Sequence, residues 1–270
     1  MAGVIRKQRE TEQEILPEQK GCDMANKVAV LIPAAGASRR YKGKTKKQFV
    51  EINGRACFVR TLEMFADRDD VKQVVMAIAA EDEELFKIKW EAKLAFFGVK
   101  VVMGGKERHD TIEKLLAEVE DDVDLIALHD AVRPCVTSKQ IDAVFAAAAE
   151  TGAALLACPV TATVKKTDPD MNILETVDRS QLWEAQTPQV FKPDIIRRAY
   201  AQKDKVKENI TDDAQLVEAL GEPVKIVESS SGNIKITTGV DIAIAGAILS
   251  ARPKPKPKGP AGPWAAEQGW

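Results

Sequence analysis

The amino-acid sequence predicts an α/β fold in which a mostly parallel β-sheet is sandwiched by helices. Short apolar runs alternate with longer amphipathic ones along most of the chain, which is typical of strands that feed helices. Hydrophobic residues make up 45% of the 270 positions, enough to bury a large core. Because no break in composition interrupts the alternation, we expect a single domain over residues 27–251.

The first half of this domain supplies most of the predicted sheet. Its first strand carries the apolar run Val28 to Ile32. Strands are expected at 28–33, 73–79, 99–103, 124–129 and 153–158, and helices near 56–66, 81–95, 107–119 and 138–150. Open α/β sheets bind ligands beyond the carboxyl ends of their strands, so the loops that follow these strands are the first candidates for a site.

The pattern changes after residue 158. Two extended, Thr- and Val-rich pieces, 160–167 and 173–178, flank the turn-like Thr167-Asp-Pro-Asp, which indicates a β-hairpin. We expect this hairpin to project from the domain as an arm of about 160–187. The alternation then returns, with helices near 193–202, 211–220 and 239–251 and strands near 224–228 and 233–237.

Both ends of the chain differ from the domain between them. Residues 1–26 are rich in charge and contain no apolar run long enough for a signal peptide or a membrane span, so we expect a mobile extension. The run Arg252-Pro-Lys-Pro-Lys-Pro-Lys-Gly-Pro cannot continue a helix, because proline lacks the amide donor. Residues 252–270 are therefore expected to form an extended, mobile tail.

Charge and cysteine content narrow the functional classes. Charged residues reach 30% but nearly cancel, to a formal net charge of -2, so binding of nucleic acid through overall charge is not expected. The four cysteines, Cys22, Cys57, Cys135 and Cys158, form no CxxC pair, which indicates neither a zinc site nor a disulfide framework. These features favour a cytoplasmic protein without a membrane partner.

The loop after the first strand carries a chemical signal. Ala34, Ala35 and Gly36 are small enough to let backbone amides approach a phosphate, and the basic stretch from Arg40 to Lys47 supplies positive charge. A solvated basic surface loop is the competing interpretation. The loop is no P-loop, because Gly36 lies two positions too far from Gly43-Lys44-Thr45, and no GxGxxG occurs.

Further motifs occur in the order in which one protein family has them. They are Ala34-Ala-Gly-x-x-x-Arg40, Lys47-Gln48-Phe49, Gly104-Gly-x-x-Arg108, His129-Asp-Ala-Val-Arg-Pro134, Pro159-Val-Thr-x-Thr163-Val-Lys165, Val177-Asp-Arg179, Leu182-Trp-x-x-Gln-Thr187-Pro-Gln and Asn233-Ile-Lys235-Ile-Thr. Over roughly residues 27 to 250 the chain resembles the 2-C-methyl-D-erythritol 4-phosphate cytidylyltransferases of the non-mevalonate isoprenoid pathway. Each motif is weak alone, but the ordered set is specific.

The resemblance implies a Rossmann-like nucleotidyltransferase fold and a reaction. CMP would pass from CTP to 2-C-methyl-D-erythritol 4-phosphate, giving 4-diphosphocytidyl-2-C-methyl-D-erythritol and pyrophosphate. Catalysis would consist mainly of positioning two anions and neutralising their charge. A ribitol-5-phosphate cytidylyltransferase, which differs mainly in the arm, is an open alternative, and so is a catalytically inactive nucleotide-binding regulator.

The resemblance also implies roles for individual residues. The catalytic residues would be Arg40, Lys47 and Lys235. CTP would contact Ala34, Ala35, Gly36, Gly104, Gly105, Thr111 and Asp130, and Asp130 would also hold Mg²⁺ or another divalent cation against the phosphates. The sugar-alcohol phosphate would contact Arg133, Thr163, Lys165, Arg179 and Thr187, partly from the arm of the second subunit in a homodimer. His129 is expected to be a packed or capping histidine and not a catalytic base.

Five positions depart from the family pattern. The family usually has glycine where Ser38 stands, methionine where Tyr41 stands and proline where Lys46 stands. Lys106 occupies a commonly acidic position, and Ala162 replaces a common aspartate. Since serine is compatible with a turn, we expect the first loop to keep its shape despite Ser38.

Overall fold

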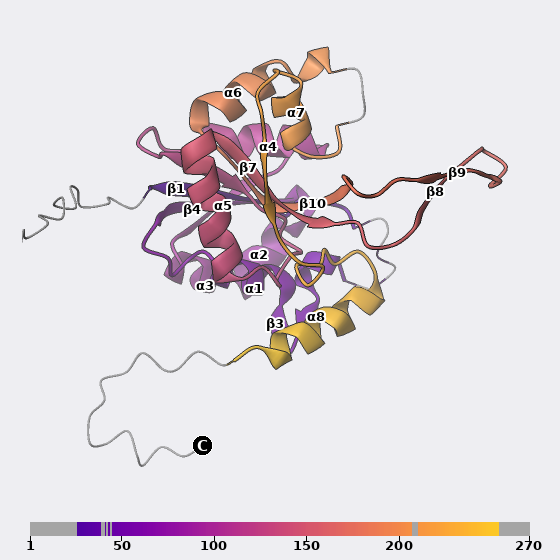
Figure 1. Cartoon of the computed structure of the whole chain (residues 1–270). Helices are drawn as coiled ribbons and strands as arrows, with labels where there is room; N and C mark the ends of the chain where they lie inside the picture. The colour runs from indigo at the N-terminus through magenta and orange to yellow at the C-terminus, as the bar shows by residue number, and fades with distance from the viewer. Residues whose placement is uncertain (1–25, 39–40, 42, 44, 207–209, 254–270) are drawn as a thin grey trace, which may run out of the picture.

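The computed structural model describes residues 26–38, 41, 43, 45–206 and 210–253 (Figure 1). The predicted extension 1–26 and tail 252–270 lie almost entirely outside these residues. Arg252 is an exception, because its guanidinium donates hydrogen bonds to the backbone carbonyls of Cys135 and Val136. This contact lies one residue beyond the predicted end of the domain at residue 251.

A seven-stranded sheet of order β11-β7-β10-β6-β1-β4-β5 forms the centre of the fold. Its strands are β1 (Val28–Pro33), β4 (Val71–Ile78), β5 (Val99–Met103), β6 (Leu125–Leu128), β7 (Ala153–Pro159), β10 (Trp183–Phe191) and β11 (Lys225–Glu228). Neighbouring strands pair in parallel, except that β10 runs antiparallel to both β6 and β7. The predicted mostly parallel sheet is confirmed.

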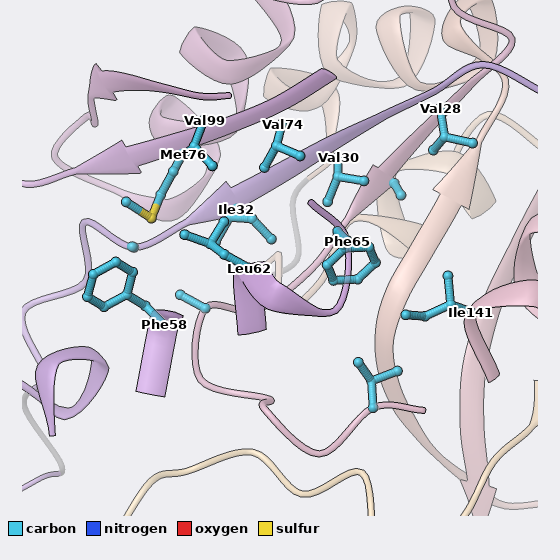
Figure 2. Packing of buried hydrophobic residues seen from close by; sticks show 14 of the residues in the cluster. Val28, Val30, Ile32, Phe58, Leu62, Phe65, Val74, Met76, Val99 and Ile141 are labelled. Carbon is cyan, nitrogen blue, oxygen red and sulfur yellow. The ribbon is translucent and has the colours of Figure 1, made fainter. Parts of the chain in front are cut away.

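Helices cover both faces of the sheet, as predicted. Val28, Val30 and Ile32 of β1 point to one core layer, which Figure 2 shows from close by, with Phe58 and Leu62 packed against them. The helices of this layer are α1 (Cys57–Glu63), α2 (Glu83–Lys89), α3 (Glu91–Phe96) and α5 (Ser138–Thr151). The intervening residues of β1 face α4 (Arg108–Ala117), α6 (Pro193–Ala201) and α7 (Ala214–Glu218). Burial on both faces explains why β1 is apolar throughout.

A small hairpin, short 3₁₀ turns and a final helix lie outside the central sheet and its covering helices. A hairpin of β2 (Glu51–Ile52) and β3 (Arg55–Ala56) follows the 3₁₀ turn η1 (Lys47–Phe49), and α8 (Gly239–Ala251) packs near it. Two further 3₁₀ turns are η2 (Ala80–Asp82) and η3 (Lys203–Lys205). In the part of the chain that is described, no helix combines the length and apolar character that a membrane crossing requires.

The helix predicted at 81–95 is divided into α2 and α3 at Trp90. The backbone of Trp90 leaves the helical region, at φ −134° and ψ −10°. Its ring stacks on Phe49, with centroids 5.3 Å apart, and also packs against Phe58 and Phe86. Burial of this aromatic cluster accompanies the interruption, which the periodicity of the sequence does not show.

The secondary structure of the second half differs from the expectation in two places. The arm consists of β8 (Val164–Thr167) and β9 (Ile173–Val177), whereas β10 starts at Trp183, within the predicted arm, and returns to the sheet. The predicted strand at 233–237 is not a strand, and this segment is a loop held by the hydrogen bond from Ile236 N to the carbonyl of Val132. The sequence did not predict β10, because it contains Pro188 and a proline within an apolar run argues against a central strand.

Candidate active site

A cleft of about 730 Å³ opens at the carboxyl ends of β1, β4, β5 and β6. Its walls come from the loops after these four strands, together with Lys47 of η1 and Lys235 of the 233–237 loop. The predicted residues that line it are Ala34, Ala35, Gly36, Lys47, Gly104, Gly105, Thr111, Asp130 and Lys235. The fold therefore brings the residues expected to bind nucleotide to one place. Arg40 lies outside the described residues.

A buried glutamine, Gln48, holds the two ends of the first loop together. The Gln48 side-chain amide donates hydrogen bonds to the carbonyls of Ala34, at 3.0 Å, and Gly36, at 3.3 Å. Gln48 and Phe49 are both buried, so η1 is anchored directly after Lys47. A β-carbon placed on Gly36 would meet no described atom within 4 Å. The packing of the described chain therefore does not require glycine at this position, and the space next to it belongs to the cleft.

A second part of the lining is built around two glycines that the fold does require. A β-carbon on Gly104 would lie 2.4 Å from Cβ of Ala35, and one on Gly105 would lie 2.2 Å from Cβ of Asp110. The Thr111 hydroxyl accepts a hydrogen bond from the amide of Gly105 and lies 3.1 Å from the carbonyl of Glu107. Thr111 thus shapes the turn, and its hydroxyl is already engaged within the chain.

Asp130 is the electrostatic centre of the cleft. Its Oδ2 lies 3.0 Å from Nζ of Lys235 and 3.1 Å from Nε of Arg133. Burial alone would raise the pKa of this carboxyl, but the surrounding cations, Lys235 first, hold the pKa of Asp130 well below its usual range. The carboxylate is therefore ionised at neutral pH. Arg133 also donates to the carbonyl of Asn233, at 2.7 Å, and so fixes the loop that carries Lys235.

A chain of hydrogen bonds supports Asp130 from below. The Thr187 hydroxyl accepts from the backbone amide of Asp130, at 3.0 Å, and lies 3.1 Å from Nδ1 of His129. The other ring nitrogen, Nε2, lies 3.2 Å from the carbonyl of Arg133, so it donates, and Nδ1 accepts from Thr187. Burial lowers the pKa of His129 to about 4. The prediction that His129 is a packed histidine is confirmed.

The predicted residues for the second substrate divide into two groups. Arg133 and Thr187 are buried beneath Asp130, where both hold it in place. Thr163, Lys165 and Arg179 lie on the exposed arm, which projects away from the sheet (Figure 1). Within the described residues of a single chain, none of these five belongs to the lining of the cleft.

The structure adds Arg108 to the cleft. Its guanidinium makes two hydrogen bonds, of 2.7 and 2.6 Å, to the fully buried carboxylate of Asp213, which also accepts from the Tyr200 hydroxyl. Burial opposes the charge of Arg108, but Asp213 raises its pKa above the usual range. The motif Gly104-Gly-x-x-Arg108 contained the signal for this residue, although no role was predicted from it. Lys114 was missed as well, and it donates to the carbonyl of Gly104 at 2.9 Å.

The donor set of the cleft fits a cation that arrives with phosphates. No group of three His, Cys, Asp or Glu side chains that could hold a metal ion occurs among the residues that the structure describes. Mg²⁺ commonly takes one or two protein carboxylates and completes its coordination with phosphate oxygens and water. Asp130 provides one ionised carboxylate at the cleft, which fits such a shared site.

Comparisons with known proteins identify relatives over most of the chain. Residues 28–251 match the family model described as 2-C-methyl-D-erythritol 4-phosphate cytidylyltransferase. The enzyme of that name from Rhodopirellula baltica is 39% identical over 237 residues, covering 84% of this chain and 96% of its own length. The one from Pelotomaculum thermopropionicum is 40% identical over 228 residues, with the same coverage. A crystal structure of 4-diphosphocytidyl-2C-methyl-D-erythritol synthase from Anaerococcus prevotii, 27% identical, superposes with a TM-score of 0.72 over 84% of this chain and 97% of that one.

Proposed function

The chain belongs to the 2-C-methyl-D-erythritol 4-phosphate cytidylyltransferase family and is a nucleotidyltransferase of isoprenoid biosynthesis by the non-mevalonate route, and we propose that the cleft described above is where it joins CMP from CTP to 2-C-methyl-D-erythritol 4-phosphate. One observation carries the proposal. Lys47, Asp130 and Lys235, which are far apart in the sequence, line the same cleft as the small residues of the first loop. The two lysines supply positive charge for a polyanion, and the small residues let the backbone amides come close to it.

The triphosphate of CTP lies along the first loop in this proposal. Arg40, Lys47 and Lys235 supply positive charge for the phosphates and for the leaving pyrophosphate. Because Lys235 already contacts Asp130 and Asp130 is held by Arg133, its ammonium needs little rearrangement when the phosphates bind.

Asp130 also holds Mg²⁺ or another divalent cation in this proposal. Such a cation, when bound, withdraws negative charge from the phosphates. The ionised state of Asp130 at neutral pH supports this role. Removing divalent cations with a chelator is expected to stop pyrophosphate release, and adding Mg²⁺ is expected to restore it. Unchanged release in the chelated enzyme would refute the metal requirement.

The cytosine ring lies against the turn of Gly104 and Gly105. We expect the site to prefer CTP over ATP and GTP, because a pocket shaped for one ring cannot admit a purine without a clash. CTP carries a hydrogen-bond donor on its ring where UTP carries an acceptor. If the site offers backbone acceptors at this point, one of them stays unpaired when UTP binds. Pyrophosphate release is expected to be strongly faster with CTP than with UTP, and equal rates would overturn the assignment of the base.

The sugar-alcohol phosphate binds between the cleft and the arm of a second subunit. Thr163, Lys165 and Arg179 offer hydroxyl groups and cations, but they stand away from the cleft of their own chain. A homodimer in which each arm completes the neighbouring site resolves this separation. The exposed apolar side chains of Ile173 and Leu174 support such an interface, since pairing would bury them.

The acceptor is tested by measuring pyrophosphate release from CTP with two candidates. We expect fast release with 2-C-methyl-D-erythritol 4-phosphate and slow release with ribitol 5-phosphate. Preference for ribitol 5-phosphate would replace the proposed acceptor, and no release with either would indicate a nucleotide-binding regulator.

We propose the cytoplasm as the compartment, in line with the free, buried cysteines Cys57, Cys135 and Cys158.

A further inference from the structure

Ser38 has a backbone conformation that glycine adopts more readily. Its φ is 55°, in the left-handed region, where the β-carbon of an L-residue crowds the following carbonyl. A serine at this position therefore carries a conformational cost that a glycine would not, and its side chain must be examined for a compensating contact.

The Ser38 hydroxyl makes two contacts at the other end of the same loop. It donates to Oε1 of Gln48, at 3.0 Å, and it accepts from the backbone amide of Lys47, at 3.2 Å. The opposite end of the Gln48 amide donates to the carbonyls of Ala34 and Gly36. The hydroxyl thus joins the start of the loop to η1, and one of its two bonds is made to the backbone of Lys47 itself.

We propose that Ser38 is a positioning residue for Lys47. Its hydroxyl fixes the orientation of the Gln48 amide and the backbone of Lys47, so that the ammonium is directed to the phosphates before CTP binds. A glycine can adopt the same backbone conformation but cannot make either bond. The inference rests on the proposed role of Lys47 in binding the triphosphate.

The hydroxyl is tested by comparing Ser38→Gly with the wild-type chain. The glycine variant keeps the left-handed conformation without strain, which offsets part of the stability lost with the two hydrogen bonds, so it is expected to unfold close to the wild-type temperature. Loss of the two bonds is expected to lower kcat about tenfold, the effect of roughly one hydrogen bond, with a smaller change in KM for CTP. Ser38→Ala removes the same bonds, keeps the strain and is expected to be slower still.

Asn53→Gly is the matched control. Asn53 also has a positive φ, 48°, and its side chain also bonds across the chain, to the carbonyl of Gly246, but it does not line the cleft. Its variant is expected to keep wild-type kcat. Wild-type kcat in Ser38→Gly, or an equal loss of kcat in Asn53→Gly, would overturn the proposal.

A double-mutant cycle with Lys47→Ala separates this inference from the proposed site. If Ser38 acts through Lys47, adding Ser38→Gly to Lys47→Ala is expected to cause no further loss of kcat. The same tenfold loss in both backgrounds would contradict the inference while leaving the role of Lys47 intact. Near-normal kcat in Lys47→Ala alone would instead show that the proposed phosphate site is wrong, and the inference would fall with it.

Discussion

At the cleft, the carboxylate of Asp130 is buried and held by several partners, whereas the charged side chains along β8 and β9 are exposed and bond to other residues of the arm. Asp130 contacts Lys235, Arg133 and, through its amide, Thr187. On the arm, Lys165 bonds to the neighbouring Thr176 at 2.6 Å. Among the described residues, Asp130 is therefore held by its own chain, while the side chains of the arm bond mainly within the arm. Under the proposed function, the nucleotide site is preorganised within one subunit, and the acceptor site depends on the arm of a second subunit.

The largest expected effect comes from breaking the support of the cleft at Asp213. Asp213→Ala leaves the guanidinium of Arg108 without its two hydrogen bonds and Tyr200 without its acceptor. We expect the free energy of unfolding to fall by roughly 3 kcal/mol, the low end for a buried pair, because Arg108 is partly exposed. Urea unfolding measures the change.

Glu222→Ala provides the matched control for this pair. Glu222 also accepts a hydrogen bond from an arginine, Arg198, at 2.8 Å, but on the surface. Its loss is expected to change the free energy of unfolding by less than about 0.5 kcal/mol. Equal losses in the two variants would show that the Arg108–Asp213 pair does not support the cleft more than a surface pair does.

Lys47→Ala tests the catalytic side of the same region. We expect kcat to fall about a hundredfold, the usual cost of one preorganised charge contact, with little change in the unfolding temperature. Arg40→Ala is expected to behave alike. Steady-state rates of pyrophosphate release and a thermal melt measure the two quantities. If both variants release pyrophosphate at near-normal rates, the triphosphate does not lie along the first loop.

Mixed dimers test whether the arm serves a neighbouring cleft. Lys47→Ala and Arg179→Ala are each expected to be nearly inactive alone, but a mixed dimer contains one site that is wild type at both positions. Random exchange would restore roughly a quarter of the sites. The variants are unfolded and refolded together, the mixed dimers are confirmed by mass, and activity is measured with CTP, Mg²⁺ and acceptor. Confirmed mixed dimers that stay inactive would place Arg179 in its own subunit or in a structural role.

The sequence predicted the residues that line the cleft better than the buried residues that hold them in place, and the reason is geometric. Gly36, Gly105 and Asp130 lie two or three residues beyond the ends of β1, β5 and β6, and parallel strands bring their carboxyl ends to one edge, so their convergence could be foreseen. The position of Asp213 could not be foreseen, because no periodic pattern marks a fully buried aspartate at the start of a helix.

Two further features could not be predicted, because they depend on the backbone conformation of the folded chain. The contribution of Ser38 depends on a φ of 55° that only the folded loop reveals. The segment around Lys235 has the alternation of a strand, yet it forms a loop, since its backbone is tied to Val132 and Ser230 and pairs with no strand of the sheet. The family resemblance grouped Lys235 with the first loop, and Lys235 does line the cleft, but the local pattern was wrong about the structure that carries it.

The smallest expected effect concerns the end of that loop, where α8 begins. The carboxylate of Asp241 accepts hydrogen bonds from the amides of Thr237, at 2.8 Å, and Thr238, at 2.7 Å. Burial by itself would raise the pKa of Asp241, but these bonds to the charged form lower it below its usual value. A carboxyl whose pKa is lower in the folded chain contributes stability at pH values above its unfolded pKa, about 4, and loses it as the pH falls through the folded pKa. Asp241→Asn is therefore expected to lower the free energy of unfolding by roughly 0.3–1 kcal/mol at pH 7, and the difference from wild type should vanish in acid. Urea titrations of both proteins from pH 7 to about 3 measure it, and a difference that stays constant over that range would mean that the charge of Asp241 does not stabilise the helix start.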